Sequence, residues 1–146
     1  MIKKYIKLIC EILSIKEPPI QVDASVFENS TALAYFDTEN KILLVPNSPK
    51  PSFDTFFALA HELRHAWQIK TNYLLYFSNY KTRKELSVKE YNSQLAEIDA
   101  NAFAHMIVTS FFGVEPLYKG LDDEVKGKIK SRTNELMLEY RRFLQN

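Results

Sequence analysis

Two histidines and the glutamate between them carry the clearest chemistry in this sequence. His61, Glu62 and His65 form the pattern HExxH within residues 60–67. On a helix, residues four apart lie one turn above each other, so the two imidazoles can converge on one metal ion. The glutamate then reaches a water molecule beside that ion. The spacing predicts a hydrolytic zinc site, and the alternative interpretation is a pair of histidines packed in the core.

A third protein ligand is required, because catalytic zinc sites use three and leave one position for water. We select Glu97, from the segment AEIDANAFA at residues 96–104. Glu97, Asn101 and His105 recur at every fourth position and share one helix face, whereas Asp99 points elsewhere. The alanines of this segment allow another helix to approach closely. The alternative for Glu97 is a solvated face of an amphipathic helix.

The neighbours of Glu97 have expected roles of their own. Asn101 is expected to accept a hydrogen bond from a ligand histidine and so fix the orientation of its ring, although a solvated position is equally compatible with the pattern. His105 is a reserve ligand, a transition-state donor or a packed histidine, and we expect the last. Hydrolysis also needs a donor to the tetrahedral oxyanion. The candidates are Tyr91, His105, Tyr73 and Arg64.

Apolar periodicity predicts the helices that position these residues. Apolar side chains recur at helical spacing around the HExxH pattern and predict a helix from about Phe53 to Ile69, with Ser52 as its N-cap. A second long helix should begin near residues 88–91 and end at about Phe112, where Gly113 is a stop signal. The second helix carries Glu97.

The rest of the chain is expected to build a small sheet and two further helices. The patterns predict a helix at 2–15, a short strand at 20–27 and a hairpin of strands 31–36 and 41–45. A proline-rich connector at 46–51 follows, and a last helix begins after Gly120. Residues 71–89 give no clear pattern. The predicted class is α+β, with a small antiparallel or mixed sheet packed on a helical bundle.

Composition narrows the class of protein. With 146 residues and 46% hydrophobic content, the chain is expected to form one domain spanning residues 1–146. A net charge of +1 does not indicate the strongly basic surface that is typical of nucleic-acid-binding proteins. The single cysteine, Cys10, excludes an internal disulfide and fits a reducing compartment. No run approaches the roughly 18 apolar residues of a membrane span. We therefore expect a soluble cytoplasmic protein without membrane or nucleic-acid partners.

Three segments together resemble the ImmA/IrrE family of small intracellular zinc metallopeptidases. They are KILLVP at 41–46, AHELRHAWQ at 60–68 and EIDANAFA at 97–104. Members of that family typically show an apolar strand, a helix of the form AHELGH and a helix with E-x-x-A-N/D-x-F-A. Residues 97–104 match the last pattern at each defined position. The resemblance covers roughly residues 30–105, and its motifs are short.

This resemblance implies a zincin-like fold and a set of site residues. Carried over, it assigns His61, His65 and Glu97 as zinc ligands and Glu62 as the catalytic glutamate. Arg64 stands where the family usually has glycine, and residues 105–108 replace a leucine-rich ending with proline. A divergent branch, carried by a phage or mobile element, fits these departures.

The resemblance also suggests how a substrate is held. In zinc peptidases of this plan, the strand before the metal helix commonly offers a free edge to an extended substrate. That role would fall to residues 41–45, with Ile42, Leu43 and Leu44 at the centre. The alternative is an ordinary half-buried strand.

The sequence therefore predicts a zinc-dependent endopeptidase acting on an intracellular protein, which by analogy with the family is a transcriptional regulator. One alternative is a regulatory module that binds zinc, turns over weakly and recognises a protein partner through the same cleft. A purely structural metal site is disfavoured, because closed zinc sites favour cysteine ligands.

Overall fold

The computed structural model describes residues 1–47 and 50–144, and it has the predicted α+β class. Within these described residues, six helices and three strands follow one another as α1 (Ile2–Leu13), β1 (Ile20–Val22), β2 (Tyr35–Asp37), β3 (Ile42–Val45), α2 (Phe53–Phe77), α3 (Val88–Asn92), α4 (Leu95–Phe112), α5 (Asp123–Glu139) and α6 (Arg141–Leu144). Part of the predicted proline-rich connector, Ser48 and Pro49, lies outside the described residues. None of the helices in the described part is long and apolar enough to cross a membrane.

The three strands form a mixed sheet in the order β1-β3-β2. The hairpin prediction is confirmed, because β2 pairs antiparallel with β3. The prediction of a free edge at Ile42, Leu43 and Leu44 is wrong. Strand β1 pairs parallel with β3 on its other side, and the Leu43 N–H donates to the Pro19 carbonyl at 2.9 Å. Strand β3 is thus the central strand, and the free edges belong to β1 and β2.

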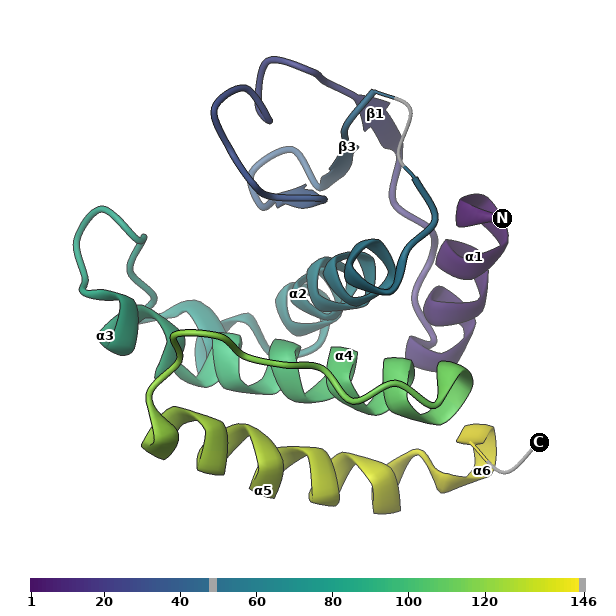
Figure 1. Cartoon of the computed structure of the whole chain (residues 1–146). Helices are drawn as coiled ribbons and strands as arrows, with labels where there is room; N and C mark the ends of the chain where they lie inside the picture. The colour runs from purple at the N-terminus through teal and green to yellow at the C-terminus, as the bar shows by residue number, and fades with distance from the viewer. Residues whose placement is uncertain (48–49, 145–146) are drawn as a thin grey trace.

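Helix α2 occupies the middle of the molecule. Figure 1 shows it between the sheet on one side and α4 on the other, with α5 packed against the far side of α4 and α1 beside α2. The outer strand that packs on α2 is β2. Because α2 and α4 bear the predicted metal ligands, their contact is the interface that decides the geometry of the site.

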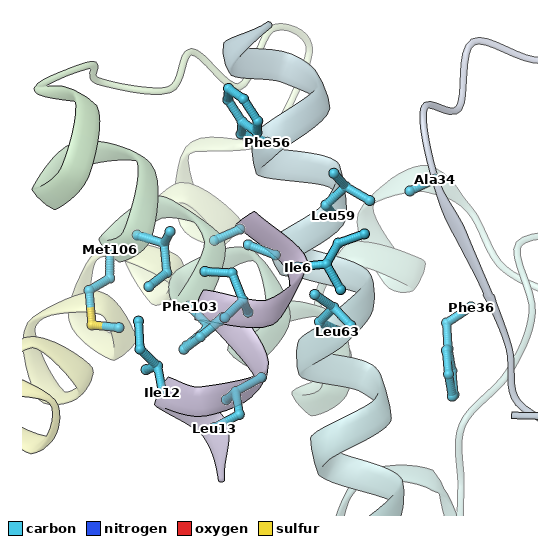
Figure 2. Packing of buried hydrophobic residues seen from close by; sticks show 14 of the residues in the cluster. Ile6, Ile12, Leu13, Ala34, Phe36, Phe56, Leu59, Leu63, Phe103 and Met106 are labelled. Carbon is cyan, nitrogen blue, oxygen red and sulfur yellow. The ribbon is translucent and has the colours of Figure 1, made fainter. Parts of the chain in front are cut away.

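The hydrophobic core joins α1 to the two ligand-bearing helices. Figure 2 shows Ile6 of α1 beside Leu63 of α2, and Ile12 of α1 on the side of Met106 of α4. All four side chains are buried, at 4% exposure or less. Small residues of α4, including Ala100 and Ala104, are fully buried and allow close helix contact. The predicted amphipathic character of the N-terminal segment therefore serves to fix α2 against α4.

Helix α2 starts as predicted but runs further. The Ser52 side chain accepts a hydrogen bond from the Thr55 N–H at 3.1 Å, which confirms it as the N-cap. The helix continues past the predicted end at Ile69 to Phe77, with a kink at Asn72, where the backbone leaves the helical region at φ −157° and ψ 69°. The kink changes the direction of the last part of α2. This part belongs to the aromatic segment whose sequence shows no clear pattern.

The predicted helix at 88–112 is two helices, α3 and α4. Ser87 and Glu90 form a capping box that starts α3, and Gln94 takes an extended backbone conformation that separates α3 from α4. The Gln94 side chain hydrogen-bonds the main chain of Lys81 in both directions, at 2.8 and 3.0 Å. This contact ties the preceding loop to the start of α4. The predicted stop at Gly113 is confirmed by its left-handed φ of 66°.

Candidate metal centre

The structure brings His61, His65 and Glu97 together as one group of ligand atoms. The His61 Nε2 lies 3.2 Å from Glu97 Oε1, and the His65 Nε2 lies 3.0 Å from Glu97 Oε2. The two Nε2 atoms are 3.1 Å apart. Ligand atoms at about 2.0–2.1 Å from a tetrahedral zinc ion lie roughly 3.3 Å from one another. These separations, measured to the two different oxygens of Glu97, are close to those that a zinc ion requires.

The other nitrogen of each histidine is held by an amide oxygen. The His61 Nδ1 lies 2.8 Å from Asn101 Oδ1, and the His65 Nδ1 lies 2.8 Å from Gln68 Oε1. An amide oxygen only accepts, so each ring donates from Nδ1 and, when neutral, turns the lone pair of Nε2 towards Glu97. Two imidazole nitrogens and one carboxylate, all directed at the same position, form a donor set that fits zinc.

Asn101 occupies the position expected from its spacing, whereas Gln68 was missed by sequence reasoning. Asn101 is 9% exposed and lies one turn after Glu97 on α4. Gln68 follows His65 by three residues on α2 and is fully buried. An i to i+3 spacing brings two side chains to the same helix face, and that was the available signal.

The charges at the centre are mutually dependent. Burial disfavours a charged His65, but the carboxylate of Glu97 outweighs burial and raises the pKa of His65 to about 9. Burial likewise disfavours a charged Glu97, but the histidines outweigh it and hold its pKa well below the usual value. The side-chain exposures of His65 and Glu97 are 9% and 3%. Without a metal, a buried cation and anion thus face each other where the ligand atoms converge.

Glu62 lies on α2 between the two histidines and is partly exposed. Burial raises the pKa of Glu62 above its usual value, and the two histidines oppose that shift without cancelling it. A hydrogen bond from the backbone amide of Phe36, on β2, also lowers the pKa of this carboxylate slightly, without cancelling the effect of burial. The catalytic glutamate of the predicted pattern therefore lies between the metal ligands and the edge of the sheet.

Two tyrosine hydroxyl groups extend the site beyond Glu97. The Tyr80 hydroxyl donates to Glu97 Oε2 at 2.8 Å and lies 2.9 Å from the Tyr91 hydroxyl. Burial, then the charge of Glu97, raises the pKa of Tyr91 to about 12, so this group stays protonated at neutral pH. Tyr91 was a predicted oxyanion donor, whereas Tyr80 was missed because it lies in the irregular segment after α2.

The other candidate donors lie apart from the three ligands. Arg64 is fully buried and directed at Asp99, so its prediction as an oxyanion donor is wrong. Tyr73 is 53% exposed and its ring stacks on Phe77. His105 lies 2.9 Å from the Tyr118 hydroxyl and 3.1 Å from Glu115. It is the packed histidine that its position predicted, and it does not belong to the ligand group.

A cleft of about 840 Å³ lies near His61. Its lining includes Asn101, which contacts His61, and Phe57, but none of the three ligands and not Glu62. The ring of Phe57 lies 6.5 Å from that of His61, between ring centroids. Side chains from the loop after α4, including Leu117 and Tyr118, also line it. The cleft offers a mainly apolar surface next to the one ligand whose side chain is measurably open, at 16% exposure.

Comparison of the chain with protein-family models, curated proteins and solved structures gives no match.

Proposed function

We propose that this protein is a zinc-dependent peptidase with a zincin-like fold. The observation that carries the proposal is the convergence of His61, His65 and Glu97, whose ligand atoms all lie within 4.8 Å of one another, with each histidine Nε2 within 3.2 Å of a Glu97 oxygen. Glu62 supplies a further carboxylate on the same helix. The likeness of the two motif-bearing helices to the ImmA/IrrE pattern supports the same activity.

The residues of the chain divide the chemistry among them. A zinc ion held by His61, His65 and Glu97 would lower the pKa of water and polarise a peptide carbonyl. Glu62 takes a proton from the attacking water at its carboxylate and passes that proton to the departing amine. The Tyr91 hydroxyl, protonated at neutral pH, would donate to the developing oxyanion by turning its O–H away from the Tyr80 oxygen.

The proposed substrate is a polypeptide in an extended conformation, bound in the cleft beside His61. The strand whose free edge adjoins the metal helix is β2, which replaces β3 in that expected role. By analogy with the family, the substrate is a cytoplasmic regulatory protein, such as a transcriptional repressor of a mobile element. The proposal includes no nucleic-acid or membrane partner.

Metal content is the first test. Purified wild-type protein should hold about one zinc ion per chain in elemental analysis after dialysis against metal-limited buffer. The variants His61→Ala and Glu97→Ala should lose it. His105→Ala is the matched control, because it removes the one histidine that lies outside the ligand group. A wild-type protein that stays free of zinc after resupply would overturn the proposal.

The second test separates catalysis from metal binding. Glu62→Gln should keep zinc and lose cleavage of an unstructured protein substrate by roughly 10²–10⁴-fold. Cleavage that persists in this variant would show that another group moves the proton.

One observation favours a second candidate, a zinc-binding regulatory module with weak turnover. His65 and Glu97 are nearly inaccessible, with side-chain exposures of 9% and 3%, which leaves little access to the metal except past His61. Such a module would recognise a protein partner through the same cleft. It predicts that Glu62→Gln retains the biological effect of the wild type, whereas a peptidase loses it.

A further inference from the structure

Four buried or partly buried polar side chains lie directly behind His65, on the side away from Glu97. We call them the Asp99 cluster, and its members are Arg64, Gln68, Asp99 and Arg132. Asp99 accepts from Arg64 Nε at 2.7 Å, from Gln68 Nε2 at 2.8 Å and from Arg132 Nε at 2.9 Å. Arg64, Gln68 and Asp99 are each fully buried. The cluster joins α2, α4 and α5.

The hydrogen bonds of Gln68 determine which way its amide faces. Its Nε2 donates to the Ala96 carbonyl at 3.0 Å and to Asp99, and both of these partners only accept. The Oε1 must therefore face His65, where it lies 2.8 Å from Nδ1. If the amide were reversed, its oxygen would meet two acceptors in a buried site, and all of these groups would lose their hydrogen bonds.

The amide orientation in turn decides the tautomer of His65. An oxygen at Nδ1 requires an N–H there, which leaves Nε2 as the nitrogen free to bind a metal. A reversed amide would present N–H groups to Nδ1 and favour the opposite tautomer, with its proton on Nε2. Asp99 thus acts on His65 through Gln68, although it touches neither the ligand atoms nor the cleft lining.

We propose that Asp99 is a positioning residue of the metal centre, which fixes the tautomer and orientation of His65 through Gln68. Arg64 and Arg132 hold the Asp99 carboxylate in place, so α5 contributes to metal affinity from outside the site. The effect on affinity rests on the proposed metal-binding function, but the effect on the tautomer does not. The two parts are therefore tested separately.

The informative variant is Gln68→Met, which has a similar volume and leaves Asp99 paired with both arginines. We expect zinc affinity, measured by competition with a chelating dye, to fall roughly 10- to 100-fold. The double variant Arg64→Met/Asp99→Leu removes the buried Arg64–Asp99 pair, leaves Arg132 paired with Glu135, and should lower affinity in the same direction, by about 10-fold or more. Leu136→Ala is the control, because it opens a cavity on α5 without removing a hydrogen bond.

The tautomer is read from the ¹⁵N shifts of the His65 ring in metal-free protein above about pH 9, where the ring loses its second proton. The wild type should carry its proton on Nδ1, and Gln68→Met should shift the population towards Nε2–H. Unchanged affinity and unchanged ring shifts in Gln68→Met would overturn the positioning role. A wild type that binds no zinc yet shows the Nδ1–H tautomer would instead overturn the metal-binding function and leave the positioning role standing.

Discussion

Arg64 and Asp99 form a two-point ion pair in the interior of the protein. Arg64 Nε lies 2.7 Å from Asp99 Oδ2, and the other contact, between Arg64 Nη2 and Asp99 Oδ1, measures 3.1 Å. The guanidinium also stacks over Trp67 at 3.6 Å from the ring centroid. Because Arg64 precedes a ligand histidine and Asp99 follows the ligand glutamate by two residues, the pair sets the register of α2 against α4.

Replacing Arg64 alone should lower the free energy of unfolding substantially. Arg64→Met leaves the Asp99 carboxylate buried and only partly compensated by Arg132, and we expect a loss of about 3–5 kcal/mol in the free energy of unfolding. Arg64→Met/Asp99→Leu should be closer to wild type, because neither fully buried charge remains and Arg132, which is partly exposed, keeps its contact with Glu135. Urea denaturation of the metal-free proteins measures the free energy of unfolding of the single and the double variant. Equal losses in the single and double variants would show that packing, and not the unpaired charge, sets the cost.

The same pair predicts a loss of stability in acid. Burial alone would raise the pKa of Asp99, but the hydrogen bonds and charge of Arg64 outweigh it and hold that pKa below its usual value of 3.8. A lowered folded-state pKa contributes stability that is complete above pH 3.8 and is lost as pH falls towards the folded-state value. Urea midpoints measured between pH 6 and pH 2 should decline in this window. The Arg64→Met/Asp99→Leu protein should decline less steeply.

Zinc should stabilise the folded state. An ion that binds only the folded protein adds about 2.7 kcal/mol at a concentration 100 times its Kd, which corresponds to a rise of roughly 5–10 °C in the Tm. EDTA should reverse the shift. In His61→Ala the shift should disappear, while His105→Ala should retain it. A shift of equal size in His61→Ala would place the stabilising ion at another site.

Tyr80 should affect zinc affinity, whereas Tyr91 should affect the rate of catalysis. Tyr80→Phe removes the 2.8 Å hydrogen bond to Glu97 and should weaken zinc binding by about 10-fold. Tyr91→Phe should leave zinc affinity near the wild-type value and reduce kcat by roughly 10²–10³-fold, if its hydroxyl meets the oxyanion. Dye competition and single-substrate kinetics measure the two effects. A Tyr91→Phe protein with unchanged kcat would remove Tyr91 from the mechanism.

Cys10 should be unreactive in the folded protein. Its side chain is 2% exposed, and burial, with a smaller contribution from the charge of Glu17, raises the pKa of the thiol to about 11. At pH 7.5 the reactive thiolate is then below about 0.1% of the total. Modification by a thiol reagent should follow the unfolding equilibrium as urea is added. Rapid modification in native buffer would mean that α1 detaches from the core.

Much of the site was predictable because it depends on spacing along single helices. His61, His65, Glu97 and Asn101 were placed by the four-residue repeat, and the structure brings the first three together and puts Asn101 against His61. Their helices were predictable from apolar periodicity, as was the cap at Ser52. These features need no knowledge of how distant segments meet.

Several missed features depend on contacts between distant segments. Tyr80 reaches Glu97 only after the chain leaves α2, and Gln68 gains its role from Asp99 and the Ala96 carbonyl on α4. The central position of β3 depends on β1, whose three residues are all exposed and show no alternation. A pattern along the chain does not reveal which partner supplies the second strand.

The kink at Asn72 has a mechanical consequence for the metal centre. Phe77 follows His65 by twelve residues, which is about 18 Å along the axis of a straight helix. The two rings are nevertheless 5.9 Å apart, between centroids, so the chain must double back after the kink. The bend places the aromatic ring of Phe77 against His65 and brings the Tyr80 hydroxyl to Glu97. A residue that stiffened position 72 into regular helix would therefore open the centre to bulk water without altering any ligand.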